Sequence, residues 1–296
     1  MNVNNCSEVF EDLKDLGFDN LTDISIYNAE DKIDKNKKNM NSMEGREENY
    51  LFDRKLKCPV CESNITVRAV KSSSIRIISR DTDFMIYYKD PNPLFYDAWV
   101  CTQCGYSAIS SQFYNISEAQ KKVVREKVCS KWKQKSYGHV YTIDTAIERY
   151  KLALLTSVVK NTKTSERALM CIKLAWLYRL KKDSENENKF LSLALQGFIN
   201  AFEKEQFPIS GMDQASLTYL IGELYRRLGD NDHALLWFSK VFSTNMAKSK
   251  IKEMAREQKY LIVEQIKKQK PFPEKPCKIE NNNRKNLFGR LFSWRK

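Results

Sequence analysis

The chain has 296 residues, 42% of them hydrophobic and 29% charged, and 50 Lys and Arg against 37 Asp and Glu give a net charge of +13. This length corresponds to about two domains and is enough to bury a core. The composition excludes a collagen-like fibre, a wholly disordered chain and a multi-pass membrane protein, because no apolar run reaches the roughly 18 residues of a spanning helix. The N-terminus lacks the pattern of a signal peptide, so we expect a cytoplasmic protein with reduced thiols.

The positive charge is concentrated near the C-terminal end. Residues 246–296 hold 15 basic and 5 acidic side chains, a net charge of +10. Residues 58–115 hold 5 of each, and residues 1–57 hold 9 basic and 13 acidic side chains. The distribution favours a local basic tail over a nucleic-acid-binding surface that covers the whole protein.

Residues 1–49 are predicted to form a short helix followed by a flexible tether. The helix runs from Ser7, a suitable N-cap, to Phe18, and Gly17 can end it. Its apolar side chains fall on one stripe: Val9, Phe10, Leu13 and Leu16. Residues 29–49 are polar and charged, so they bury too little apolar surface to offset the entropy of ordering.

Residues 50–115 are predicted to form a small β-rich domain. Short runs of β-branched and aromatic residues at 65–70, 75–79, 84–88 and 96–100 are typical of strands.

Residues 116–270 are predicted to be helical. Ser117 and Gln120 match a capping box at the first helix, and longer helices are expected near 142–158, 164–181, 187–204, 213–228, 231–245 and 248–269. The short connections favour antiparallel helix pairs. The fold class expected is therefore α+β, mostly α, with a β-rich module followed by helical repeats.

Two segments of the helical part resemble each other. Residues 174–179 match residues 221–226 at an offset of 47, and the helices that follow align at an offset of 44. The second copy resembles a tetratricopeptide repeat at its small and aromatic packing positions: Gly222, Tyr225, Gly229, Ala234 and Phe238. The alternative is an ordinary amphipathic helical bundle. Stacked helix pairs form concave grooves that usually bind peptides.

Four of the eight cysteines form two Cys-x-x-Cys pairs, and these predict a metal site. The ligands expected are Cys58, Cys61, Cys101 and Cys104. Two such turns can complete a tetrahedral shell of sulfur, which suits Zn²⁺, and the intervening strands would form a zinc ribbon. The alternatives are a redox dithiol and an iron–sulfur centre. Four sulfur ligands leave no open position for water, so hydrolytic catalysis is disfavoured.

Asp81 and Asp83 lie between two predicted strands. They could form a second polar site, or they could belong to a capped turn held by ion pairs. Basic side chains lie on neighbouring strands at Arg68, Arg76 and Arg80. Four aromatic residues could stack on nucleic-acid bases or belong to the core: Tyr87, Tyr88, Tyr96 and Trp99.

The segment 271–296 is predicted to be a basic amphipathic tail. Prolines between 271 and 276 end the last helix, and residues 284–296 place apolar side chains among basic ones: Leu287, Phe288, Leu291, Phe292 and Trp294. The segment fits an interfacial helix on anionic lipid, a helix docked in a groove of this or another protein, or a frayed end.

The chain also resembles a known family. The resemblance rests on five segments, which together look like the bacterial domain of unknown function 2225 family: residues 58–61, 79–83, 92–97, 101–106 and 146–153. The resemblance extends from about 50 to 270. It implies a zinc-binding part followed by tetratricopeptide-like helices in cytosolic bacterial proteins, and no established activity. Glu62 departs from the pattern, because a glycine commonly follows such a metal-binding turn.

No catalytic motif accompanies these features. The sequence contains no Gly-x-x-x-x-Gly-Lys, Gly-x-Gly-x-x-Gly or Gly-x-Ser-x-Gly pattern, and neither of its two histidines, His139 and His233, neighbours a nucleophile. We therefore expect a non-enzymatic, zinc-binding adaptor whose helical groove binds a protein or peptide partner. The alternatives are a nucleic-acid-binding zinc-ribbon protein and a membrane-peripheral scaffold held by residues 284–296.

Overall fold

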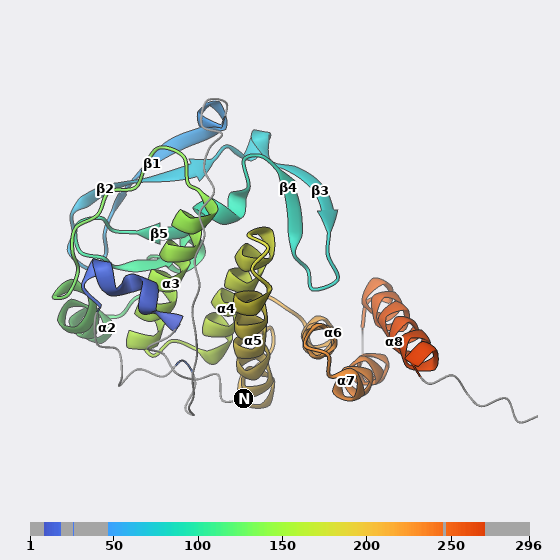
Figure 1. Cartoon of the computed structure of the whole chain (residues 1–296). Helices are drawn as coiled ribbons and strands as arrows, with labels where there is room; N and C mark the ends of the chain where they lie inside the picture. Colours follow the sequence, from blue (N-terminus) through green and yellow to red (C-terminus); the bar gives the residue numbers. More distant parts are fainter. Residues whose placement is uncertain (1–8, 19–25, 27–46, 245–246, 270–296) are drawn as a thin grey trace, which may run out of the picture.

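The computed structural model describes residues 9–18, 26, 47–244 and 247–269, which form an α+β fold that is mostly helical (Figure 1). The expected fold class is confirmed. Most of the predicted tether and all of the predicted tail lie outside the described residues. Among the helices that are described, none has an apolar stretch long enough to cross a lipid bilayer.

The strands form three separate two-stranded antiparallel sheets. The sheets are β1 (Leu51–Lys57) with β2 (Asn64–Val70), β3 (Arg76–Arg80) with β4 (Ile86–Lys89), and β5 (Ala98–Val100) with β6 (Ser107–Ile109). The long interval between the two cysteine pairs therefore holds β2, a complete β3–β4 hairpin and β5.

The strand predictions are correct for β2 and β3. The strand expected at 84–88 begins only at Ile86, because Phe84 belongs to the preceding turn and has a positive φ of 70°. The strand expected at 96–100 begins only at Ala98, because Tyr96 ends a 3-10 helix (Pro93–Tyr96). The side chain of Asn92 accepts a hydrogen bond from the backbone N–H of Leu94 and caps that helix. β1 and β6 have no counterpart among the predicted strands. In β1 only Leu51 and Leu56 are buried, so its polar sequence lacks the usual signal.

Most helix predictions agree with the structure to within two residues at each end. The helices are α2 (Glu118–Val124), α3 (Ile143–Val159), α4 (Thr164–Leu180), α5 (Ser184–Lys204), α6 (Gln214–Arg227), α7 (Asn231–Ser243) and α8 (Ser249–Gln269). The predicted capping box of Ser117 and Gln120 is present at α2, which continues into a π-helical turn, Arg125–Cys129. α5 begins three residues earlier than expected, because the side chain of Asp183 caps it.

Each helix from α3 to α8 packs against the next one in the sequence, as an array of helical repeats requires (Figure 1). The positions matched at an offset of 44 are all buried: Ala146, Phe190 and Ala234; Tyr150, Ala194 and Phe238; Ala153, Gly197 and Val241. The detailed likeness to tetratricopeptide repeats stays a prediction.

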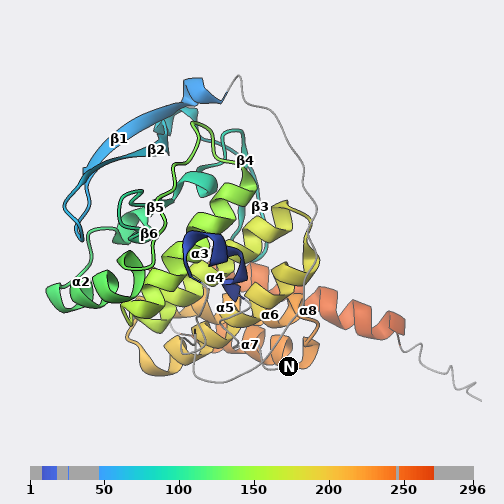
Figure 2. The ribbon, with the colours of Figure 1, turned by 60° about the vertical axis from the view of Figure 1, so that its left-hand side comes forward.

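One hydrophobic core joins the β-rich part to the helices. α3 packs against β5 and β6 (Figure 2). Buried residues of one continuous cluster extend from Trp99 and Tyr106 to Leu224 on α6. The fully buried side chain of Arg149 on α3 donates from Nε to the carbonyl oxygen of Ala98, 3.0 Å away. The predicted division of the chain at residue 115 stays a prediction, and it falls within this shared core.

The predicted N-terminal helix is present over part of its range as a 3-10 helix, Glu11–Leu16. Its predicted apolar stripe is buried as expected, and the helix packs against α3. Gly17 ends it with a positive φ of 98°. A Cβ there would lie 1.8 Å from the carbonyl oxygen of Lys131, so only glycine fits.

A second glycine sets the contact between α6 and α7. A Cβ on Gly222 would lie 2.9 Å from the ring of Phe238. We expect Gly222→Ala to lower the free energy of unfolding by about 1–3 kcal/mol, since the ring must move out of a packed core. Denaturant unfolding measures this loss, and Gly138→Ala is the control because its Cβ meets nothing closer than 3.9 Å. If Phe238→Leu does not reduce the effect of Gly222→Ala, the contact is not its cause.

Candidate functional site

Two hairpin turns bring the four predicted ligands together. Cys58 and Cys61 lie in the turn between β1 and β2, and Cys101 and Cys104 lie in the turn between β5 and β6. The four sulfur atoms all lie within 4.8 Å of one another. The structure thus assembles a four-cysteine cluster that could bind a metal ion.

Both cysteine turns have the same backbone hydrogen bonds. In the first turn, the N–H of Glu62 donates to the carbonyl of Cys58 at 3.0 Å. In the second, the N–H of Gly105 donates to the carbonyl of Cys101 at 2.8 Å. Glu62 and Gly105 both have a positive φ, 62° and 77°. The departure from glycine at position 62 therefore places a non-glycine residue in the left-handed region.

The sulfur positions fit a tetrahedral metal shell. The Sγ atoms of Cys58 and Cys104 are 3.7 Å apart, and those of Cys61 and Cys101 are 3.6 Å apart. A tetrahedron with metal–sulfur bonds of about 2.3 Å has edges of about 3.8 Å. In addition, the N–H of Val60 points at the Sγ of Cys58, 3.5 Å away, and so supports a thiolate at that position.

The segment after β6 covers both cysteine turns. Arg125 donates from Nε and Nη2 to the carbonyl oxygen of Val60, at 3.1 and 2.7 Å. The Nε1 of Trp132 donates to the carbonyl oxygen of Thr102 at 2.9 Å. The indole also lies where a side chain at Gly105 would be, 2.6 Å from its ideal Cβ. The turns are therefore anchored to the helical part of the chain.

A fifth thiol adjoins the cluster. Cys129 ends the π-helical turn and lies close enough to Cys104 for the two thiols to shift each other's pKa. No spacing rule relates it to the two pairs, so only the fold could reveal it. Hydrogen bonds from Cys101 and Cys104 lower the pKa of Cys58 to about 2, and hydrogen bonds with Cys101, Cys129 and Cys58 raise the pKa of Cys104. When one of these crowded thiols ionises, its negative charge disfavours ionisation of the others. A bound cation would remove this penalty, because it attracts every thiolate.

The arrangement is closed, as a structural metal site is. Cys58, Cys101 and Cys104 are buried, and only Cys61 reaches the surface. With four protein ligands present, a bound tetrahedral ion keeps no position for water or a substrate. The energy of metal binding then contributes to folding.

The acidic turn between β3 and β4 is a set of ion pairs with α4 and α6. Arg179 on α4 donates to Asp81 at 3.0 Å and to the fully buried Asp83 at 2.6 Å. Arg227 on α6 also pairs with Asp81, at 2.5 Å. The Nε1 of Trp176 donates to Asp83 at 3.0 Å.

α6 supplies a further acid to this turn. The hydroxyl of Thr82 donates to Glu223, at 2.5 Å, and Glu223 in turn accepts from Arg226 and Arg227 at 2.7 and 2.8 Å. Every acidic side chain of the turn is thus paired with a base. The capped-turn alternative accounts for Asp81 and Asp83, although their partners lie about 100 and 145 residues further along the chain.

The predicted basic and aromatic residues do not form one surface. Arg68 pairs with Asp53 at 3.1 Å, whereas Arg76 and Arg80 are exposed on β3. Tyr96 and Trp99 are both buried: Tyr96 stacks on Tyr141, and Trp99 packs edge-on against Phe113. The hydroxyl of Tyr87 donates to Asp81, 3.3 Å away, and Tyr88 is half-buried. A platform for stacking bases is therefore absent from the described part of β3 to β5.

The two histidines also lie apart. His139 hydrogen-bonds with Arg68, and His233 hydrogen-bonds with Asp230, 2.7 Å away, near the start of α7. The predicted amphipathic segment 284–296 lies outside the described residues.

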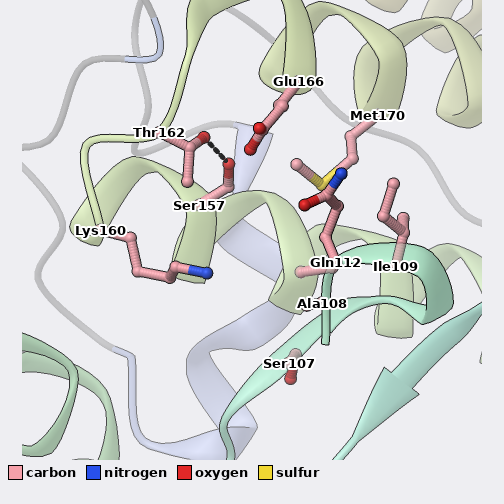
Figure 3. A pocket seen from close by; sticks show the side chains of 10 residues that line it. Ser107, Ala108, Ile109, Gln112, Ser157, Lys160, Thr162, Glu166 and Met170 are labelled. Atoms are coloured by element: carbon pink, nitrogen blue, oxygen red, sulfur yellow. Dashed lines mark hydrogen bonds between the residues drawn. The ribbon is translucent and has the colours of Figure 1, made fainter. Parts of the chain in front are cut away.

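Sequence reasoning did not identify a small pocket between β6 and the ends of α3 and α4 (Figure 3). Lys160 and Glu166 contribute its charged groups, and the Nζ of Lys160 donates to the carbonyl oxygen of Asn115 at 2.8 Å. Burial lowers the pKa of Lys160 and raises that of Glu166. Its empty volume of about 280 Å³, part of it open to solvent, is smaller than that of a typical ligand pocket. We assign no chemistry to it.

Comparisons with known proteins agree with the resemblance seen in the sequence. Residues 51–262 match a family described as "Uncharacterized protein conserved in bacteria (DUF2225)". The chain is also similar to an uncharacterized protein of Borreliella burgdorferi, with 25% identity over 161 residues that cover 47% of this chain. That match spans 57% of the relative's length. No solved structure matches the chain.

Removal of the metal is expected to unfold the β-rich part. Each cysteine turn is short, and the three sheets have only two strands each, so the ion would supply much of the local stability. We expect Cys101→Ser or a chelator to release one ion per chain and to lower the melting temperature, measured by elemental analysis and circular dichroism.

Cys129→Ser is the matched control for this prediction, because four cysteines complete the shell without it. We expect that variant to keep its ion. An unchanged melting temperature after chelation would contradict the prediction.

The positive φ of Glu62 predicts that Glu62→Gly stabilises the first cysteine turn. Glycine adopts this conformation without a steric penalty, while the exposed ion pair of Glu62 with Lys57 contributes little. We expect a higher melting temperature and slower release of the metal to a competing chelator. The control is Glu62→Gln, which keeps the strained backbone but loses the charge; an equal gain from both variants would point to charge instead.

The acidic turn predicts a loss of stability in acid. Burial alone would raise the pKa of Asp81, but Arg227, the N–H of Thr82 and Arg179 hold it below its usual value of 3.8. A depressed pKa in the folded state means that this stabilisation is complete above the unfolded pKa and disappears as the pH falls through the folded pKa. Thermal unfolding between pH 7 and pH 2 tests this.

Asp81→Asn is expected to lower stability at pH 7 by about 1–3 kcal/mol and to flatten the acid limb of the stability curve. Asp15→Asn, at an exposed position, is the control. An acid limb of unchanged slope in Asp81→Asn would show that other groups cause the acid lability.

Proposed function

The chain belongs to the DUF2225 family of bacterial proteins, and we propose that it is a non-enzymatic, zinc-binding adaptor whose helical half holds a protein or peptide partner. The four-cysteine cluster and the helical array are its two working parts. In this proposal the metal stabilises the β-rich part and takes no part in a reaction.

Zinc is proposed because of the chemistry of the cluster. Four thiolates at tetrahedral spacing suit Zn²⁺, which has no geometric preference of its own and forms stable closed sites with sulfur. The cluster lies between hairpin turns, and the hydrogen bonds from Arg125 and Trp132 hold those turns in place. These features favour a structural ion over a redox dithiol, which needs only one cysteine pair.

The observation that carries the adaptor proposal is the exposure of large apolar side chains on the last two helices. Five of the ten exposed large hydrophobic residues in the described part of the chain lie there: Leu236 and Phe242 on α7, and Tyr260, Leu261 and Val263 on α8. None of the ten lies on α3, α4, α5 or α6. Apolar exposure concentrated on two helices that pack together favours an interaction surface there.

Basic side chains flank these apolar ones. Arg256 and Lys259 of α8 lie over the ring of Phe242, each about 5.7 Å from its centre. Tyr260 and Val263 follow Arg256 at helical spacing on the same side of α8. We call this set, with Phe242, the α7–α8 patch. Its composition fits an acidic peptide with apolar anchor residues.

The partner proposed is a separate protein and not the chain's own tail. Residues 284–296 hold five basic and no acidic side chains, so like charges would oppose their docking on the α7–α8 patch. We also propose that the protein is cytoplasmic and that its tail, residues 271–296, can contact anionic lipid at a membrane surface.

A pull-down from bacterial lysate tests the adaptor. We expect the full chain to retain a partner that Phe242→Glu/Tyr260→Glu does not retain, at 0.5 M as well as 0.15 M salt. The matched control is Tyr50→Glu/Tyr114→Glu, which changes two exposed aromatic residues away from α7 and α8. Equal retention by all three proteins would refute the proposed surface, and a nuclease-sensitive partner lost at 0.5 M salt would favour the nucleic-acid alternative.

A further inference from the structure

The outer edge of β3 has no strand beside it within the described residues, and β3 is more exposed than its partner β4. All five of its residues, Arg76–Arg80, are exposed, whereas β4 is largely half-buried. In Figure 1, β4 lies between β3 and α5, so β3 is the outer strand of the hairpin. Within the described residues β3 pairs only with β4, which leaves the backbone groups of its outer edge without a strand partner.

Two isoleucines are exposed on this edge. Ile77 is 51% exposed and Ile78 is 68% exposed. The pairing with β4 shifts between Ile77 and Ser79, so Ile78 is an extra residue with no partner on β4. Proteins usually protect an unpaired edge with charged residues or a bulge. β3 has both, with Arg76 and Arg80 at its ends and the bulge at Ile78, yet its two isoleucines stay exposed between the arginines.

The hairpin that carries this edge is rigidly anchored. Its turn is held by Asp81 and Asp83 on Arg179 and Arg227, and Phe84 packs against the ring of Tyr219 with ring centres 5.5 Å apart. An anchored edge strand loses little further entropy when a second strand pairs with it.

The charges at the two ends of β3 disfavour a second copy of the chain as the partner. In an antiparallel pair of β3 strands centred on Ile78, Arg76 of each copy would face Arg80 of the other. Like charges directly opposite each other destabilise a sheet. Neither arginine forms an ion pair within the described residues, and Arg76 donates only to the carbonyl oxygens of Ser73 and Ile75.

We propose that the outer edge of β3 binds an extended segment of a partner protein by strand addition, and that this segment carries acidic residues opposite Arg76 and Arg80 with apolar residues between them. Main-chain hydrogen bonds would supply affinity, and the two arginines would select the sequence. The aliphatic side chains of Ile77 and Ile78 favour a peptide over single-stranded nucleic acid, whose bases stack on exposed aromatic rings in proteins that bind it. This site is separate from the α7–α8 patch.

The test uses the full chain and two fluorescein-labelled peptides, TEVTVET and TKVTVKT, whose charged residues have the spacing of Arg76 and Arg80. Fluorescence polarisation is expected to show that the wild type binds the acidic peptide about tenfold or more tightly than the basic one, since two cross-strand charge pairs change sign. Hydrogen exchange is expected to slow at residues 76–80 when the acidic peptide binds.

The variant Arg76→Glu/Arg80→Glu is expected to reverse the peptide preference. Lys250→Glu/Lys252→Glu, a charge reversal on α8, is the matched control and should leave it unchanged. Phe242→Glu/Tyr260→Glu should also leave it unchanged, so failure of the α7–α8 patch and failure of this site are distinguishable.

Three results would overturn the proposal. The first is the absence of a preference between the peptides in the wild type, and the second is binding without slower exchange at residues 76–80. The third is a wild-type dimer, detected by sedimentation, whose formation protects the same amides, because a second copy would then occupy the edge.

Discussion

The buried ion pair between Asp83 and Arg179 is the interaction on which the arrangement of this protein depends. Asp83 has no exposed surface, so its charge would be strongly unfavourable without a partner. Removal of one member of such a pair typically costs about 3–5 kcal/mol. The same guanidinium also reaches Asp81 and Glu187, and in this way one side chain of α4 joins the β3–β4 turn to α5.

This link determines where the β3–β4 hairpin lies. A two-stranded sheet has little stability of its own, and β3 buries none of its residues. The hairpin keeps its place because its turn is inserted between α4 and α6, where Arg227 holds it from the other side. The exposed edge of β3 is therefore a consequence of contacts made at the turn and not of packing along the strand.

The four-cysteine cluster depends on a similar combination of local and tertiary contacts. Each cysteine turn is closed by local contacts, since the backbone bonds of Cys58 with Glu62 and of Cys101 with Gly105 join residues four positions apart. The pairing of the two turns is a tertiary event, and Arg125 and Trp132 from the following segment stabilise it. Loss of a metal ion bound by the cluster would thus affect the packing of that segment as well as the turns.

The four clustered cysteines, most of the helices and the family could all be predicted from the sequence alone. Two Cys-x-x-Cys pairs can converge in few ways. Amphipathic helices are recognised in a sequence by their period of 3.6 residues and by capping residues such as Ser117. Strands β1 and β6 were not predicted, because β1 is polar and β6 is short. The contacts of Cys129 with Cys104 and of Asp83 with Arg179 could not be predicted, because they join residues far apart in the chain. Those pairings and the exposure of β3 follow from the tertiary structure, because the burial of a residue depends on what packs against it and not on its neighbours in sequence.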